Sequence, residues 1–198
     1  MPRSDHYFAT QPDVPSSPHT VRVDLRDLHL ELESDRGVFA AARLDPGTRE
    51  LLEVAPHPPP SGDLLDLGTG YGPIAIALAR RSPEARVWAV DVNERALELV
   101  RRNLVTAGTG NVVPTSPDQV PAQTRFAAIY SNPPIRIGKE ALHGMLEHWL
   151  ERLAPGARCF LVVQRHLGSD SLARWLAESG HPTRRLASRK GYRILEVS

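Results

Sequence analysis

The sequence predicts a doubly wound α/β domain, in which helices cover both faces of a mostly parallel β-sheet. The main observation is a rhythm that begins after residue 62, where short apolar runs typical of strands alternate with stretches of helical periodicity. Alternating β and α units of this kind build a parallel sheet with helices on both faces. A second observation is the proline-rich segment His57–Gly62, which excludes both helix and central strand and marks a linker before that rhythm.

Two runs of alternating apolar residues before the linker predict a β-hairpin. The first run is Val21, Val23 and Leu25, and the second, in shifted phase, is Leu28, Leu30 and Leu32. Asp45 and Pro46 then start a helix that runs to about Val54, because Asp is a favoured N-cap and Pro suits the first helical position. We therefore expect residues 1–56 to form an N-terminal extension, with 1–17 on the surface, packed on the same domain as residues 57–198.

The alternating part of the chain predicts six strands and four helices. The expected strands are Leu64–Leu67, Arg86–Val90, Val112–Pro114, Phe126–Ser131, Arg158–Val163 and Tyr192–Val197. The expected helices are Pro73–Arg81, Glu94–Ala107, Lys139–Leu153 and about Ser171–Glu178. Within the third helix one set of residues recurs at helical spacing and is predicted to be core and not a cofactor site. This set is Leu142, Met145, Leu146, Trp149 and Leu153.

From its composition, we expect the chain to be a cytoplasmic protein. Its 198 residues, 41% of them hydrophobic, suit one globular domain, and no apolar run is long enough for a membrane helix. The first 17 residues lack the apolar core of a secretory signal. The single cysteine, Cys159, excludes an internal disulfide, and its mid-strand position predicts a buried, inert thiol.

The charge distribution is compatible with a nucleic-acid partner but does not require one. The net charge is only +1, but from Arg136 onward 11 Lys or Arg residues face 6 Asp or Glu. The basic residues near the C-terminus are Arg184, Arg185, Arg189, Lys190 and Arg193. They either contact RNA phosphates or form a solvated face. The histidines are not spaced like metal ligands and no cysteine pair accompanies them, so we expect no metal.

A glycine-rich loop and a later acid predict a nucleoside site. Residues 66–72 read Asp-Leu-Gly-Thr-Gly-Tyr-Gly between a strand and a helix, and Asp91 ends the next strand 21 positions after Gly70. A carboxylate there can accept hydrogen bonds from both ribose hydroxyls. Asp66 can meet an ammonium group but would repel a pyrophosphate, and the spacing Gly-x-Gly-x-Gly departs from the dinucleotide pattern. These features favour S-adenosylmethionine over a nicotinamide cofactor. The simpler interpretation, without a ligand, is that the glycines form an ordinary turn and the acid caps a helix.

The segment Asn132-Pro133-Pro134 predicts the chemistry. It follows a strand at the sheet edge where open α/β folds bind ligands. The Asn132 side-chain oxygen and the Pro133 carbonyl could accept both hydrogens of one amino group, which favours the pyramidal form of a conjugated nitrogen and stabilises charge that develops on it. Taken alone, the segment is equally well explained as a tight exit from a strand.

Together these motifs resemble the class I S-adenosylmethionine-dependent methyltransferases of the small-domain family. Within that family, the chain resembles the ribosomal small-subunit RNA guanine-N2 methyltransferases and their single-domain relatives. Further motifs of that group extend the resemblance over nearly the whole chain. They are His6-Tyr7-Phe8, Gly37-Val38-Phe39, Asp45-Pro46-Gly47-Thr48 and Lys190-Gly191-Tyr192-Arg193-Ile194.

The resemblance implies a Rossmann-like sheet of seven strands with the last one antiparallel, and it assigns roles to residues. Asp66, Gly68 and Gly70 would line the methionine part of the cofactor, and Thr69 belongs to the same cofactor site. Asp91 would hold the ribose, Asn93 would flank it, and Asp118 would meet the adenine amino group. Asn132 would adjoin the cofactor and, with Pro133 and Pro134, hold the target amine. The aromatic residue that stacks on the base in the family is here Ile135, so Phe39 or Arg136 would take over the stacking. A proline, Pro117, is inserted beside Asp118.

The expected function is thus methylation of guanine N2 in small-subunit ribosomal RNA, as a step of rRNA processing. The partner would be ribosomal RNA or the small subunit, without a membrane or a metal. A protein glutamine N5-methyltransferase is the alternative, because an amide nitrogen poses the same chemical problem. A nicotinamide oxidoreductase would leave the Asn-Pro-Pro segment unexplained. A non-catalytic RNA-binding module that retains the fold would leave Asp91 and Asn132 unexplained.

Overall fold

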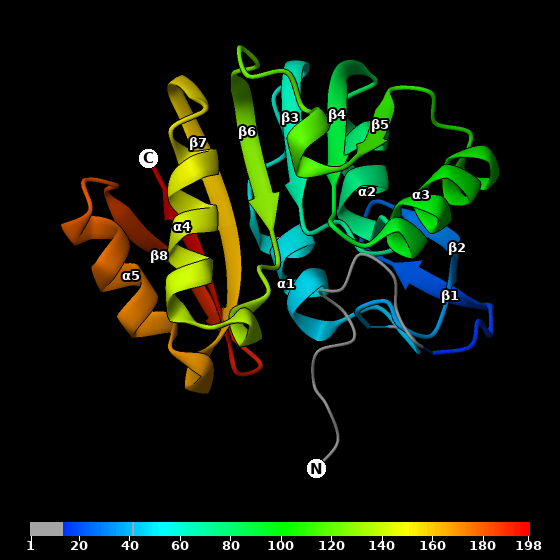
Figure 1. Cartoon of the computed structure of the whole chain (residues 1–198), viewed down its shortest axis with the longest axis horizontal. Helices are drawn as coiled ribbons and strands as arrows, with labels where there is room; N and C mark the ends of the chain where they lie inside the picture. The colour runs from blue at the N-terminus through cyan, green and yellow to red at the C-terminus, as the bar shows by residue number, and fades with distance from the viewer. Residues whose placement is uncertain (1–13, 41) are drawn as a thin grey trace.

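A seven-stranded sheet forms the centre of the computed structural model, which describes residues 14–40 and 42–198 (Figure 1). His6-Tyr7-Phe8 lies outside these residues. The strands are β3 (Ser61–Leu67), β4 (Glu84–Val90), β5 (Val112–Thr115), β6 (Phe126–Ser131), β7 (Leu153–Gln164), β8 (Thr183–Arg189) and β9 (Tyr192–Val197). Their order is β5-β4-β3-β6-β7-β9-β8; the first five are parallel, and β9 is antiparallel to both of its neighbours. The predicted fold class is confirmed.

Two helical layers cover the sheet, and the side chains of each strand alternate between them. The helices α1 (Pro46–Val54), α2 (Pro73–Arg81) and α3 (Glu94–Ala107) pack on one face, which buries Leu64, Val87 and Tyr130. The helices α4 (Lys139–Leu150) and α5 (Ser169–Glu178) cover the other, which buries Leu65, Trp88 and Ile129. Both faces are therefore apolar, as a buried parallel sheet requires.

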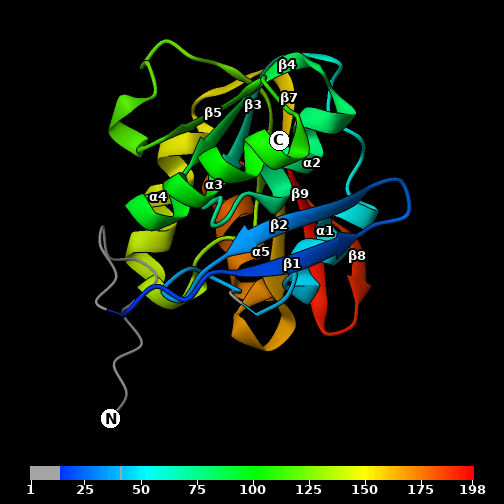
Figure 2. The same ribbon diagram turned by 90° about the vertical axis from the view of Figure 1, so that its right-hand side faces the viewer.

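The predicted hairpin is present as β1 (His19–Asp24) and β2 (His29–Ser34), a separate two-stranded sheet that Figure 2 shows beside the helices. It packs on α3, where the buried Asn103 side chain pairs with the backbone of Glu33: Oδ1 accepts from the Glu33 N–H at 2.7 Å and Nδ2 donates to the Glu33 carbonyl at 2.8 Å. The hairpin thus covers the outer side of α3. The division of the chain at residue 56 stays a prediction.

Several elements differ from the sequence-based expectation, among them β8, α4 and β3. β8 was not predicted, because its residues, Thr-Arg-Arg-Leu-Ala-Ser-Arg, are mostly polar and form an edge strand with no fully buried side chain. α4 ends at Leu150 and not at Leu153, since the Arg152 carbonyl accepts from the Phe126 N–H at 2.8 Å and draws the chain into β7. β3 begins at Ser61, inside the expected linker. Each difference comes from pairing with a neighbouring strand.

The order of the strands creates a crevice at one edge of the sheet. The chain runs from β3 to β4 on one side and later enters β6 on the other side of β3, so the connections after β3 and β6 diverge. Open α/β sheets bind ligands at such a switch point, outside the carboxyl ends of the strands. Within residues 14–40 and 42–198, no helix is long and apolar enough to cross a membrane.

Candidate active site

A cavity of about 480 Å³ opens at this crevice and gathers most of the predicted site residues. Those that line it are Phe39, Gly68, Gly70, Asp91, Asn93, Asn132, Pro133, Pro134, Ile135 and Arg136. Asp66, Thr69 and Asp118 do not line it. The cavity thus combines the end of β4, the glycine loop and the Asn-Pro-Pro segment, although their specific roles stay predictions.

The glycine loop is folded tightly over the end of β4. The backbone N–H groups of Gly68 and Thr69 both donate to the Val90 carbonyl, at 2.9 and 3.0 Å. Gly68 and Gly70 have positive φ angles of 76° and 56°, which favour glycine because other residues are strained there. This leaves bare backbone facing the cavity, so a nucleoside can approach without meeting a Cβ.

Asp91 is held by backbone donors and keeps capacity for a ligand. Its Oδ2 accepts from the Gly70 N–H and its Oδ1 from the Asn93 N–H, both at 2.9 Å. Burial raises the pKa of Asp91, and the backbone hydrogen bonds oppose that effect. Each carboxylate oxygen has a further lone pair, so two hydroxyls of a ribose can still be accepted. These residues fit the nucleoside part of S-adenosylmethionine.

Asp66 and Thr69 lie beneath the loop. The fully buried Asp66 accepts from the Thr69 hydroxyl at 2.6 Å and from the Ala75 N–H at 2.9 Å, both through Oδ2. Its Oδ1 is buried and has no hydrogen-bond partner among the described residues. Burial raises the pKa of Asp66 to about 7. The carboxyl therefore joins the glycine loop to the start of α2.

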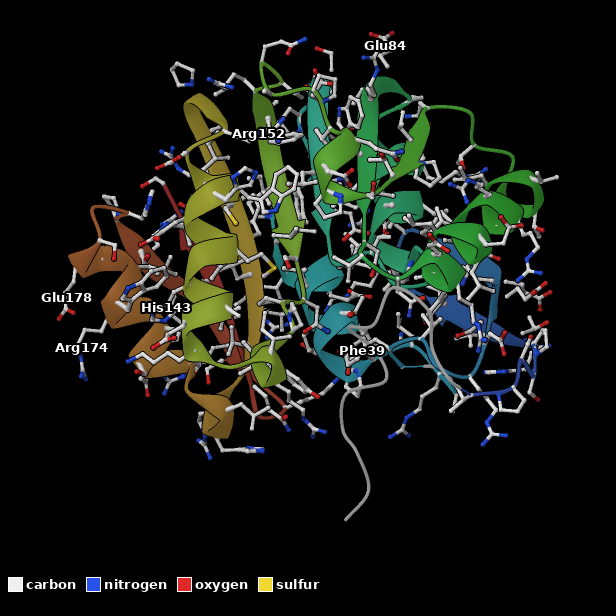
Figure 3. All side chains as sticks on the ribbon, in the orientation of Figure 1. Phe39, Glu84, His143, Arg152, Arg174 and Glu178 are labelled. Atoms are coloured by element: carbon white, nitrogen blue, oxygen red, sulfur yellow. The ribbon has the colours of Figure 1, made fainter. Side chains whose placement is uncertain are left out.

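Asp118 and Asn93 occupy different environments. Asp118 is exposed on a short 3₁₀ turn, and its neighbour Pro117 lines the cavity instead. Asn93 is buried at the N-cap of α3, where its Oδ1 accepts from two backbone N–H groups and its Nδ2 donates to the Gly37 carbonyl at 2.9 Å. Asn93 thus fixes the segment that leads to Phe39. Phe39 is 44% exposed and lies near α1 at the carboxyl edge of the sheet (Figure 3).

Asn132 is anchored to the first turn of α1. Its Nδ2 donates to Asp45 Oδ1 at 2.8 Å and to Thr48 Oγ1 at 3.0 Å. The same Asp45 oxygen caps α1 by accepting from the Thr48 N–H at 2.9 Å. Because a carboxylate only accepts, Asp45 determines which side of the amide faces the helix. Both amide hydrogens are used in this way, and the Asn132 Oδ1 remains as an acceptor for a ligand in the cavity.

The two prolines hold the backbone that follows. The Pro133 carbonyl accepts from the Ile135 N–H at 2.9 Å and keeps one lone pair for a ligand. The buried Ser131 hydroxyl donates to the Leu67 carbonyl at 2.7 Å and joins the ends of β6 and β3. The Asn-Pro-Pro segment is therefore fixed on both sides.

The cavity lining also includes residues that were not predicted as site residues, among them Asp45, Met145, Trp149 and Tyr192. Asp45 was predicted only as a helix cap, and Met145 and Trp149 only as core; all three also line the cavity. Tyr192 lines it from the start of β9, with its ring against α1: a Cβ on Gly47 would lie 2.7 Å from Tyr192 Cε1. The Asp-Pro-Gly-Thr motif at 45–48 was the signal that could have identified this contact.

The C-terminal basic residues divide between the two ends of the sheet. Arg189 pairs with Tyr192 in the β8–β9 register, at the cavity edge, whereas Arg184 pairs with Glu196 toward the opposite edge. The Arg184 guanidinium donates two hydrogen bonds of 2.9 Å to the Glu196 carboxylate. Among the described residues no group of three or more His, Cys, Asp or Glu side chains could hold a metal ion.

Comparison with known proteins places these features in a family. Residues 29–196 match the family profile described as methyltransferase small domain. The chain is 35% identical to the uncharacterized protein YbxB of Bacillus subtilis, over 98% of each chain. It is 33% identical to ribosomal RNA small subunit methyltransferase C of Pseudomonas aeruginosa, over 93% of this chain and 55% of that protein.

One solved structure has the same fold at a TM-score of 0.80 and 24% identity: the T. thermophilus 16S rRNA N2 G1207 methyltransferase in complex with AdoMet and guanosine. The match covers 94% of this chain and 52% of that one. The chain thus spans about half the length of the curated ribosomal RNA methyltransferases that it matches.

Proposed function

Because the chain belongs to the methyltransferase small domain family, we propose that it methylates the N2 amine of an unpaired guanine in small-subunit ribosomal RNA. The family match confirms the predicted class of enzyme, the Rossmann-like fold and S-adenosylmethionine as the cofactor. The proposal adds the acceptor, and with it ribosomal RNA or the small subunit as the partner and the cytoplasm as the location. Relatives named ribosomal RNA small subunit methyltransferase C support this choice.

The observation that carries the proposal is the anchored amide of Asn132. Its Nδ2 is bound by Asp45 and Thr48, and its Oδ1 remains as an acceptor at the cavity wall next to the Pro133 carbonyl. Two oxygen acceptors on adjacent residues match the two hydrogens of one exocyclic amine. In this proposal Gly68, Gly70 and Asp91 hold the cofactor, and the Asn-Pro-Pro segment holds the acceptor nitrogen.

The residues of the chain act by orientation and electrostatics. S-adenosylmethionine, when bound, would supply an electrophilic methyl group, whose bond to sulfur would break to leave S-adenosylhomocysteine. Asn132 and the Pro133 carbonyl withdraw the amine hydrogens from the plane of the base, which frees the nitrogen lone pair for attack. Positive charge develops on the nitrogen as the new N–C bond forms, and the two oxygens stabilise it. The nitrogen then loses a proton, which is acidic at that stage, so no strong base is required.

The acceptor can be identified directly. The protein is incubated with methyl-labelled S-adenosylmethionine and, in separate reactions, with small-subunit ribosomal RNA, with assembled small subunits and with a glutamine-containing protein substrate. Digestion of the RNA and mass analysis should yield N2-methylguanosine. Label at another position of guanine, or label in the protein alone, would contradict the proposal. The second result would support the glutamine N5-methyltransferase alternative.

Replacement of Asn132 tests the amine-binding role. Asn132→Ala removes an acceptor whose hydrogen bond strengthens as charge develops, so turnover should fall by roughly 10- to 100-fold while the cofactor dissociation constant changes little. Single-turnover methylation and isothermal titration measure the two quantities. Wild-type turnover in this variant would exclude the role. A non-catalytic RNA-binding module predicts instead that the unmodified protein transfers no methyl group.

A further inference from the structure

A second pocket, of about 310 Å³, is lined in part by residues next in the chain to those that line the active-site cavity. Its lining residues are Arg22, Arg43, Leu44, Pro46, Arg49, Glu50 and Lys190, which we call the arginine pocket. It contains four cationic side chains and one carboxylate. The arginine pocket is therefore suited to an anionic ligand, whereas the predicted ligand of the active-site cavity is a nucleoside.

The carboxylate of the arginine pocket is already neutralised. Glu50 is buried, and its Oε1 lies 2.7 Å from the Lys190 Nζ. Three guanidinium groups remain. Arg49 donates to the Asp24 carbonyl, which is uncharged, and Arg22 pairs with Glu31 at 3.2 Å where both side chains are largely exposed. An exposed pair of that kind is weak, so the pocket keeps a surplus of positive charge.

Arg43 contributes most directly to that surplus. It is exposed, and no hydrogen bond or ion pair of its side chain is found within the described part of the chain. Burial and the Asp45 carboxylate raise the pKa of Tyr192, which lines the active-site cavity, and the charge of Arg43 opposes that rise. A guanidinium group in this position can donate two parallel hydrogen bonds to a phosphate.

The chain itself joins the two pockets. Asp45 lines the cavity, and its neighbours Leu44 and Pro46 line the arginine pocket. Tyr192 lines the cavity, and Lys190, two residues earlier, lines the arginine pocket. Consecutive Cα atoms are about 3.8 Å apart, so the linings of the two pockets are only one or two residues apart at these points.

We propose that the arginine pocket binds a backbone phosphate of the RNA strand next to the target nucleotide. This inference rests on the proposed RNA substrate. The phosphate would be read without regard to sequence and would set the register of the strand, while the cavity reads the base. The target must be unpaired or flipped out to enter the cavity, and a fixed neighbouring phosphate would hold it there.

The geometry favours this pocket over the far end of β8. Arg184 and Arg189 are five residues apart on that strand, which corresponds to about 16 Å. Arg184 is at the end away from the cavity and is bound to Glu196. Arg185, next to it, is exposed at the same end and offers a matched control. Arg174, on α5, lies far from Phe39 and is a second control (Figure 3).

The test compares Arg43→Glu with the controls Arg185→Glu and Arg174→Glu. All three substitutions change the net charge of the protein by the same amount. Small-subunit RNA fragments of different sequence are titrated with the protein at several salt concentrations to obtain the association constant K. The KM of each fragment for methylation is then measured. For Arg43→Glu we expect the KM for RNA to rise roughly tenfold for every RNA sequence, and the slope of log K against log salt to fall by about 0.7. Both controls should stay within about twofold of the unmodified protein. Adding Arg49→Gln to Arg43→Glu should weaken binding further.

Each outcome decides between the two proposals. Equal RNA binding by Arg43→Glu and the controls, with methylation by the unmodified protein intact, would overturn the arginine pocket alone. Absence of RNA methylation by the unmodified protein would overturn the proposed function, and the phosphate site with it. Cofactor titration and urea unfolding of Arg43→Glu check that the fold and the neighbouring cavity are retained.

Discussion

The contact between Asn132 and Asp45 predicts an unusual response to the substitution Asn132→Asp. In the native protein the Asn132 Nδ2 lies 2.8 Å from Asp45 Oδ1. The substitution replaces a donor by an acceptor of the same shape and places two carboxylates against each other. Because the two residues are 87 positions apart, the effect depends entirely on the packing of α1 against the end of β6.

The distance sets the size of the effect. Two unit charges 2.8 Å apart repel by about 6 kcal/mol at an effective dielectric constant of 20. Protonation of an ordinary Asp at pH 7 costs only about 4 kcal/mol, which is less than this repulsion. The two carboxylates of the folded variant therefore share one proton. That cost falls to about 1.5 kcal/mol at pH 5. Both side chains are partly exposed, so solvent screens their repulsion. The expected difference in the free energy of unfolding between pH 5 and pH 7 is therefore about 2 kcal/mol.

The direction follows from proton linkage. The folded state of the variant binds a proton that the unfolded state releases, so its stability falls as the pH rises from about 4 to 7. Urea unfolding at pH 5 and pH 7 measures this, with Asn132→Ala as the control that loses the same donors without adding a charge. The free energy of unfolding of Asn132→Asp should recover relative to that control at pH 5. If the two variants differ by the same amount at both pH values, the proposed contact with Asp45 is wrong.

Three further predictions concern the loop and α1. Asp91→Ala should weaken the binding of S-adenosylmethionine and S-adenosylhomocysteine by about 2 kcal/mol in isothermal titration, because a charged acceptor of two hydroxyls is lost; preferential binding of NADH would overturn the cofactor. Burial raises the pKa of Asp66 to about 7, so the wild-type protein should lose stability as the pH rises from about 4 to 7. Asp66→Asn should reduce this slope in urea unfolding, and an unchanged slope would contradict the assignment. Gly47→Ala places a Cβ 2.7 Å from Tyr192 Cε1 and should cost about 1–3 kcal/mol of stability. Gly144→Ala, in α4 with open space around it, is the control and should not lower the Tm.

The sequence by itself determined the fold class and the location of the candidate site. Gly68, Gly70, Asp91 and Asn132 each follow a predicted strand, and parallel strands end at the same edge of a sheet. Their convergence on one cavity therefore required only the correct order of strands and helices along the chain. Local features could be predicted equally well, since the N-cap at Asp45 depends only on the residues next to it in the sequence.

Only the tertiary structure decided which side chain meets which. The sequence showed Asp45 as a helix cap but could not show that the same oxygen orients Asn132, because that contact depends on where α1 packs. It could not show that Asp66 faces α2, or that Arg43 and Lys190 share a pocket. The β8 strand was missed for the same reason: its polar residues form a strand because β9 offers unpaired backbone groups beside them. Pairings between distant segments are set by packing and hydrogen bonding in three dimensions, and the local pattern of residues does not encode them.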